Sequence, residues 1–293
     1  MRKNGVIMTN DITYTGVSAG PQKNRIKKLN RYFKSSARRT LFAGDNYHNA
    51  VIAPLICGMF SGGLLYLSFY VPDLLGDALA AVLNERAAAL LTSTLNVIIY
   101  TVTAFLFFMF FSGVYVMCSR MKEEPDSRPG VVSYSSFSNV FMPMSGGNFS
   151  KYLVIFLILA LQLCVVIVPC VFICRGVGGI GIPAFAVFLV RLVAICACAF
   201  MCIMFFALLL PLPYVFEHED DVPAVTAYKK SASAALPGVF RCCGLLFSFI
   251  PLLLLSVLSF GVLFFAYALP YMTLSAAKAG EYLYMIANTE RNV

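Results

Sequence analysis

Residues 242–277 read CCGLLFSFIPLLLLSVLSFGVLFFAYALPYMTLSAA and contain no charged side chain. Four further uncharged stretches occupy residues 46–72, 87–119, 152–174 and 192–216. About 20 apolar residues, each adding about 1.5 Å along a helix, cross the hydrocarbon core of a bilayer. Every stretch reaches this length, and none alternates in polarity as the strands of a membrane barrel do. The sequence therefore predicts an all-α fold, a polytopic membrane helix bundle.

The composition of the whole chain supports this prediction. Apolar residues make up 60% of the 293 residues, charged residues make up 12%, and the mean hydropathy is +0.81. Soluble domains contain about 45–50% apolar and about 25% charged residues. A water-soluble domain of this size cannot bury the excess, so we expect much of the surface to face lipid.

Six transmembrane helices are expected, because residues 242–277 are too long for one crossing and Ser259-Phe260-Gly261 allows a hairpin turn at Gly261. The expected spans are about 51–71, 91–118, 151–174, 183–212, 240–260 and 262–285. The first apolar run begins only after residue 50, which favours a retained span over a cleaved signal peptide.

The distribution of basic residues predicts the orientation. With six spans, Lys and Arg concentrate on the N-terminal segment, the inner loops and the C-terminal end, and only Arg86, Arg175 and Arg191 lie on the opposite side. Because cytoplasmic segments carry the excess of Lys and Arg, both termini are expected in the cytoplasm.

Two regions differ in charge: a basic arm, residues 1–44, and the six-helix transmembrane domain, residues 45–293. Ile26, Leu29, Phe33, Ala37 and Leu41 recur at helical spacing and predict an amphipathic helix over about 22–42 that lies in the membrane interface. Its polar face carries the residues expected to contact the membrane surface or a partner: Lys23, Arg25, Lys27, Lys28, Arg31, Lys34, Arg38 and Arg39.

The expected partner of the arm is the lipid bilayer, with anionic lipids at the cytoplasmic face. A membrane or cytoplasmic protein partner and a purely topological role for the charges are the alternatives. Nucleic acid is not expected, because the arm lacks the aromatic and glycine residues of a binding module.

Motifs that carry chemistry elsewhere have simpler interpretations here. Residues 176–181 fit the dinucleotide pattern G-x-G-x-x-G, but they join two spans instead of a strand and a helix. Residues 217–221 form an acidic cluster with His218, interpreted as a solvated loop. The ten cysteines contain no C-x-x-C pair and are interpreted as small apolar packing residues. No catalytic residue, cofactor or metal site is therefore expected.

Polar residues inside the spans are few. Gln162 is expected to form an interhelical hydrogen bond, and Arg191 is expected to extend to the outer surface. The last span contains two pairs of small residues that allow close helix packing: Ser275 with Ala279, and Ala276 with Gly280.

The sequence resembles one known family. The residues that carry the resemblance are Asp221-Val-Pro223, Ala227-Tyr-Lys-Lys-Ser231, Gly238, Phe247-Ser-Phe-Ile250 and Pro270-Tyr271, together with Gly44-Asp-Asn-Tyr47 before the first span. This pattern is similar to a bacterial integral membrane family of unknown function (domain of unknown function 975). That family is distantly similar to the membrane domain of some glycerophosphodiester phosphodiesterases. The resemblance implies six spans in the bacterial cytoplasmic membrane but no activity. Pro251 departs from its pattern and predicts a different kink.

These observations predict a non-enzymatic membrane scaffold or accessory subunit for a partner or a lipid process. A transporter or channel-like protein is the first alternative, based on the prolines in the spans and on Gln162. A lipid-modifying enzyme that uses residues 217–221 is the second.

Overall fold

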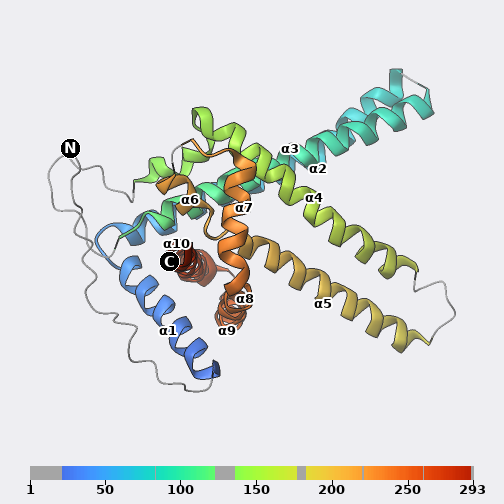
Figure 1. The fold of residues 1–293 in the computed structure, drawn as a ribbon. Coiled ribbons are helices and arrows are strands. Elements are labelled where there is room, and N and C mark those ends of the chain that lie inside the picture. The colour runs from blue at the N-terminus through green and yellow to red at the C-terminus, as the bar shows by residue number, and fades with distance from the viewer. Residues whose placement is uncertain are drawn as a thin grey trace.

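The computed structural model describes residues 22–82, 84–122, 136–176, 183–219, 221–259 and 261–291, and all regular structure in these ranges is helical (Figure 1). In chain order the helices are α1 (Gln22–Leu41), α2 (Asn46–Val82), α3 (Glu85–Ser119), η2 (Phe137–Met144), α4 (Gly146–Gly176), α5 (Ala184–Leu208), α6 (Leu212–His218), α7 (Ala224–Ala235), η4 (Leu236–Gly238), α8 (Val239–Phe247), α9 (Ile250–Leu258), η5 (Phe264–Ala268) and α10 (Leu269–Arg291).

Two long helical hairpins diverge from a common core. Figure 1 shows α2 beside α3 and α4 beside α5, with both pairs extending to the right of the view, the first upward and the second downward. Aromatic pairs hold α2 to α3 along their length: the Phe60 and Phe110 rings are 6.1 Å apart, and those of Phe69 and Tyr100 are 6.0 Å apart. At the other end, the hairpins meet α1, the short helices α6–α8 and α10.

Five helical segments are long and apolar enough to cross a membrane: Asn46–Ala78, Arg86–Ser119, Gly146–Gly176, Phe185–His218 and Ala224–Leu258. Only 11% and 6% of residues are buried in the most apolar windows of the third and fourth segments. Their side chains, such as Phe172, Phe185 and Phe188, are therefore apolar and uncovered by protein, as in helices that face lipid. These five segments overlap the first five expected spans, although the fifth begins at Ala224 instead of about residue 240.

The sixth expected span, 262–285, corresponds to η5 and most of α10. Gly261 has a φ of 81°, a left-handed conformation that glycine adopts without strain, and the chain turns back there so that η5 packs on α9. α10 is not among the five segments, and its sequence contains the charged residues Lys278 and Glu281. Six crossings and cytoplasmic termini therefore stay predictions.

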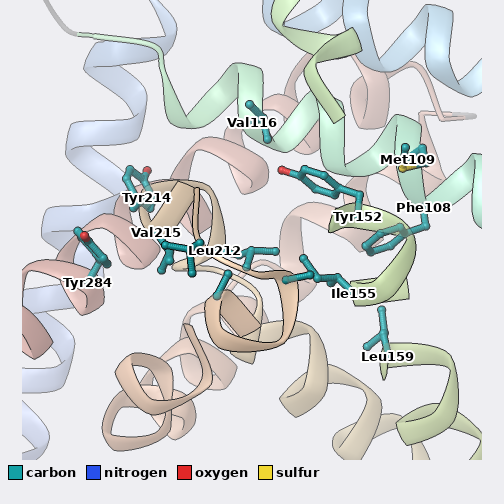
Figure 2. Close-up of a cluster of buried hydrophobic side chains, with 13 residues drawn as sticks. Phe108, Met109, Val116, Tyr152, Ile155, Leu159, Leu212, Tyr214, Val215 and Tyr284 are labelled. Atoms are coloured by element: carbon teal, nitrogen blue, oxygen red, sulfur yellow. The ribbon is translucent and has the colours of Figure 1, made fainter. Parts of the chain in front are cut away.

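The hydrophobic core surrounds α10 where the hairpins converge. One cluster joins Met109 of α3, Ile155 of α4 and Val215 of α6 (Figure 2). A second joins α1, α2, α3 and α10 around Met117 and Leu274. The third joins α1, α8 and α10, and Phe249 is one of its fully buried side chains. α10 is thus enclosed mainly by protein.

The end of α3 packs directly on the backbone of η2. A Cβ added to Gly113 would lie 1.9 Å from the carbonyl oxygen of Val140, so only glycine fits this contact. Nearby, the buried side-chain amide of Asn46 donates to the carbonyls of Thr40, 2.9 Å, and Lys122, 3.0 Å. Asn46 therefore ties the end of α1 and the start of α2 to the segment that follows α3.

Candidate functional site

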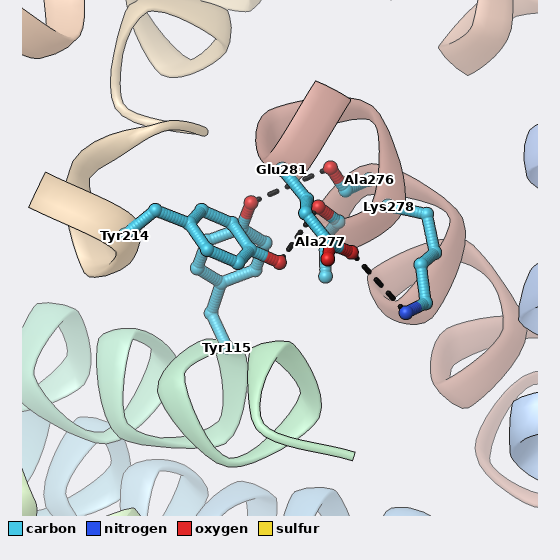
Figure 3. Close-up of polar contacts among 6 residues, drawn as sticks. All are labelled: Tyr115, Tyr214, Ala276, Ala277, Lys278 and Glu281. Atoms are coloured by element: carbon cyan, nitrogen blue, oxygen red, sulfur yellow. Dashed lines mark hydrogen bonds and ion pairs between the residues drawn. The ribbon is translucent and has the colours of Figure 1, made fainter. Parts of the chain in front are cut away.

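Two tyrosines fix α10 from neighbouring helices (Figure 3). The hydroxyl of Tyr115, on α3, donates to the carbonyl oxygens of Leu210, 2.8 Å, and Ala276, 3.4 Å. The hydroxyl of Tyr214, on α6, donates to the carbonyl of Ala277 at 2.9 Å. Backbone carbonyls on α10 and in the turn before α6 thus accept hydrogen bonds from tyrosine hydroxyls of α3 and α6.

The Leu210 carbonyl needs this side-chain donor because of the prolines around it. Leu210 lies in the turn between α5 and α6, and the residue three positions later, Pro213, has no N–H. The N–H four positions later, on Tyr214, bonds instead to the Pro211 carbonyl at 3.1 Å. The Tyr115 hydroxyl therefore supplies the donor that a regular helix would have provided.

The four small residues predicted to pack α10 are all buried: Ser275, Ala276, Ala279 and Gly280. At Gly280 an added Cβ would lie 2.4 Å from the Leu210 carbonyl oxygen and 3.0 Å from the Tyr115 hydroxyl. The absence of a side chain at Gly280 is therefore what allows α10 to approach the α5–α6 turn.

A second freed carbonyl lies at the start of α10. Pro270 cannot donate to the carbonyl of Ala266, and the chain forms the π-helical turn η5 at this point. The hydroxyl of Tyr47, at the start of α2, donates to that Ala266 carbonyl at 3.1 Å. Tyr47 thereby connects the start of α2 to η5, the π-helical turn before α10.

Lys34 bonds to a backbone carbonyl at the break between α8 and α9. Pro251, in the first turn of α9, lacks the N–H that would continue α8, and the helix breaks at Ser248 and Phe249. The Lys34 ammonium of α1 donates to the Ser248 carbonyl at 3.2 Å and lies 4.4 Å from the centre of the Phe249 ring. Burial lowers the pKa of Lys34 from its usual value. Pro251 thus lies directly after a break between α8 and α9.

Other polar side chains of the spans also have partners. Gln162 of α4 accepts a hydrogen bond from the hydroxyl of Tyr228, on α7, at 2.8 Å, which confirms the predicted interhelical bond. Arg191 of α5 is exposed, and its Nε donates to the carbonyl of Cys174 in the last turn of α4 at 2.9 Å. Arg191 thus lies near the tip of the α4–α5 hairpin.

Residues of the acidic cluster, 217–221, contact other parts of the protein. Glu219 forms an ion pair with Lys230 of α7, and the His218 ring bonds the Tyr214 carbonyl through Nδ1 at 2.9 Å. Asp221 has a φ of 52°, and Asp220 lies outside the described residues. Among the residues that the structure describes, no group of three or more His, Cys, Asp or Glu is placed to hold a metal ion.

The described part of the apolar stripe of α1 packs against the rest of the protein, with Leu29 half-buried and the side chain of Ile26 outside the described residues. Phe33, Ala37 and Leu41 pack against the core, and the Phe33 ring lies 5.4 Å from the ring of Tyr282 on α10. That α1 lies in the membrane interface stays a prediction. Helical periodicity indicates that one face is apolar, but the same pattern serves equally for packing on another helix.

The opposite side of α1 remains exposed, and we call it the outer face of α1. It consists of Arg31, Tyr32, Arg38 and Arg39, together with Phe42 directly after the helix. Tyr32 is 50% exposed and Phe42 is 56% exposed, so aromatic rings stand among the guanidinium groups. Lys34, by contrast, points toward α8. Lys23, Arg25, Lys27 and Lys28 lie on α1, but their side chains are outside the described residues.

The remaining sequence candidates are placed as follows. All ten cysteines are free thiols. Gly176 ends α4, and the rest of the glycine-rich segment, 177–181, lies outside the described residues. Gly261 occupies the turn after α9.

Sequence reasoning missed Tyr47, Tyr115 and Tyr214. For Tyr47 and Tyr115 the nearby prolines Pro270 and Pro213 are a signal, because each removes a helical N–H donor, but the sequence holds no such signal for the bond of Tyr214 to Ala277. No family model, no curated protein and no solved structure matches the chain.

Proposed function

We propose that this protein is a non-enzymatic membrane scaffold or accessory subunit whose outer face of α1 contacts anionic lipid headgroups at the cytoplasmic surface. The proposal includes six spans in a bacterial cytoplasmic membrane and membership of the family of unknown function that the sequence resembles. The exposed outer face, on a helix whose Phe33 and Leu41 are buried in the core, is the observation that carries it.

The chemistry of the outer face suits a membrane surface. Arg31, Arg38 and Arg39 are exposed, and each basic residue near an anionic leaflet contributes about 1 kcal/mol. Tyr32 and Phe42 provide aromatic rings of the kind enriched where a protein meets the interface. Because Phe33 and Leu41 anchor the helix from behind, α1 presents these groups without having to leave the core.

The anchoring decides how the proposal is tested. Removing residues 1–40 would also remove Phe33 and Ala37 from the core, so deletion would confuse binding with misfolding. Substitutions on the outer face avoid this problem. The chain contains no Trp, so Tyr32→Trp introduces a single fluorescent probe at an exposed position.

The probe is read in nanodiscs of phosphatidylcholine with and without phosphatidylglycerol. We expect its emission to shift to shorter wavelength when phosphatidylglycerol is present, because the ring then lies against the headgroups. Combining Tyr32→Trp with Arg31→Gln, Arg38→Gln and Arg39→Gln should abolish the shift at an unchanged unfolding temperature. An emission spectrum that is the same in both lipids would overturn the proposal.

A further inference from the structure

Cysteines of both helices meet inside the α4–α5 hairpin. The Cys170 thiol of α4 donates a hydrogen bond of 3.5 Å to the carbonyl oxygen of Ala194, on α5. Helical side chains lean toward the preceding turn, so Cys198, one turn after Ala194, directs its thiol to the same place. The thiols of Cys198 and Cys174 are both in hydrogen-bonding contact with that of Cys170. Sulfur atoms from two helices are therefore already neighbours.

The contact between Cys170 and Cys198 is the one that connects the helices. Cys174 lies one turn from Cys170 on the same helix, and Cys202 lies one turn from Cys198, which it also contacts. A bond within either of these pairs would leave α4 and α5 unlinked. Cys196 is exposed, whereas Cys170 and Cys198 are half-buried between the helices. Oxidation of Cys170 with Cys198 would therefore join α4 to α5.

The pair lies on helices that protein covers little. Only 11% and 6% of residues are buried in the most apolar windows of the spans that contain α4 and α5. Cys170 and Cys198 each keep part of their surface uncovered, and Phe172, two residues from Cys170, is 73% exposed. A charged oxidant would lose its hydration in such surroundings, whereas an apolar quinone dissolves in them. A lipid-soluble oxidant therefore suits these thiols.

A bond at this place would constrain a hairpin that extends away from the core. Cys170 lies in the last two turns of α4, close to the end where Arg191 bonds to the Cys174 carbonyl. A disulfide between Cys170 and Cys198 would close a loop that includes the tip of the hairpin. Such a loop lowers the conformational freedom of the opened chain and so stabilises the closed hairpin.

We propose that Cys170 and Cys198 are a redox pair that a membrane quinone oxidises to an interhelical disulfide. The two thiols lose two protons and two electrons as the S–S bond forms, and the quinone takes up both protons and both electrons to become the quinol. The disulfide then locks α4 to α5. The inference goes beyond the proposed function and does not depend on it, because the pair lies far from the outer face of α1.

The test uses the full chain in nanodiscs, reduced, freed of reductant and incubated with decylubiquinone under nitrogen. Trypsin cleavage at Arg175 and Arg191 puts Cys170 and Cys198 on separate peptides. We expect these two peptides to be linked by a disulfide, two of the ten thiols to be lost, and one quinol to form per linked chain. Unlinked peptides together with unreduced quinone would overturn the inference.

Serine variants identify the pair. Cys170→Ser and Cys198→Ser should each lose the linked product and the quinol, and Cys198→Ala should behave in the same way. Cys196→Ser is the matched control, because it removes an exposed thiol two residues away and should keep both products. A linked product that persists in Cys198→Ser and Cys198→Ala would overturn the assignment.

Thermal unfolding tests the lock. All reduced chains should unfold at the same temperature, and oxidation should raise the midpoint of the wild-type chain and of Cys196→Ser but not that of Cys198→Ser. Equal midpoints for the reduced and the linked wild-type chain would overturn the role of the disulfide as a lock.

Discussion

Gly280 shows how a single missing side chain positions the central helix. Gly280 lies close to the Leu210 carbonyl, and the same carbonyl accepts a hydrogen bond from the Tyr115 hydroxyl. Both residues therefore contact the turn between α5 and α6. Gly113 of α3 likewise lies so close to the Val140 carbonyl that an added Cβ would overlap it. Close backbone approaches of this kind are the contacts that small residues allow between membrane helices.

The glycines of the chain provide an internal comparison for a stability test. Gly280→Ala should destabilise the fold by about 1–3 kcal/mol, because the new Cβ overlaps backbone that cannot move away cheaply. Gly280→Leu should be worse. Gly62→Ala, in α2, meets nothing within 4 Å and should be neutral or stabilising by up to about 1 kcal/mol. Thermal unfolding of the purified variants in detergent measures these differences. Equal unfolding midpoints for Gly280→Ala and Gly62→Ala would contradict the close packing at Gly280.

Three prolines, Pro213, Pro251 and Pro270, lie where helices break or become π-helical, and side chains from other elements bond to carbonyls at these places. Tyr47 bonds to the carbonyl freed by Pro270, Tyr115 to the one beside Pro213, and Lys34 to the one at the Pro251 break. In a bilayer an unpaired carbonyl cannot turn to water, so these contacts are required for the kinks to persist. The kinks in turn direct α9 and α10 back onto the core.

We expect Tyr47 and Pro270 to be energetically coupled. Tyr47→Phe leaves the Ala266 carbonyl without its side-chain donor and should cost about 1–3 kcal/mol. In a Pro270→Ala background the backbone N–H that this substitution introduces restores the helical donor, so the same Tyr47→Phe substitution should cost much less. A double-mutant cycle of unfolding free energies measures the coupling. Tyr100→Phe, at an exposed tyrosine of α3, is the control, and strictly additive costs would refute the coupling.

At the scale of the whole molecule, the sequence predicts the helices better than their arrangement. Uncharged length predicted α2 to α5 and the helix pair α8–α9, because hydrophobic length is a local property of the chain. Periodicity also predicted α1, Gln22–Leu41, but could not tell that Phe33 and Ala37 face α10. The tyrosine contacts were beyond prediction, because each joins a side chain to a backbone atom 63 to 219 residues away.

The number of crossings is decided by where α10 ends. Phe33 of α1 packs on Tyr282 of α10, so the C-terminal half of α10 lies beside the N-terminal helix. Both ends of the chain should therefore be on one side, with the tip of the α2–α3 hairpin on the other. Arg39→Cys, Arg86→Cys and Thr289→Cys place new thiols at exposed positions of α1, that tip and the end of α10. On intact cells a membrane-impermeant maleimide should label only Arg86→Cys above the wild-type background, and permeabilised cells should show labelling at all three. Labelling of Thr289→Cys from outside, with Arg39→Cys protected, would mean five crossings, and the sixth span would then be wrong.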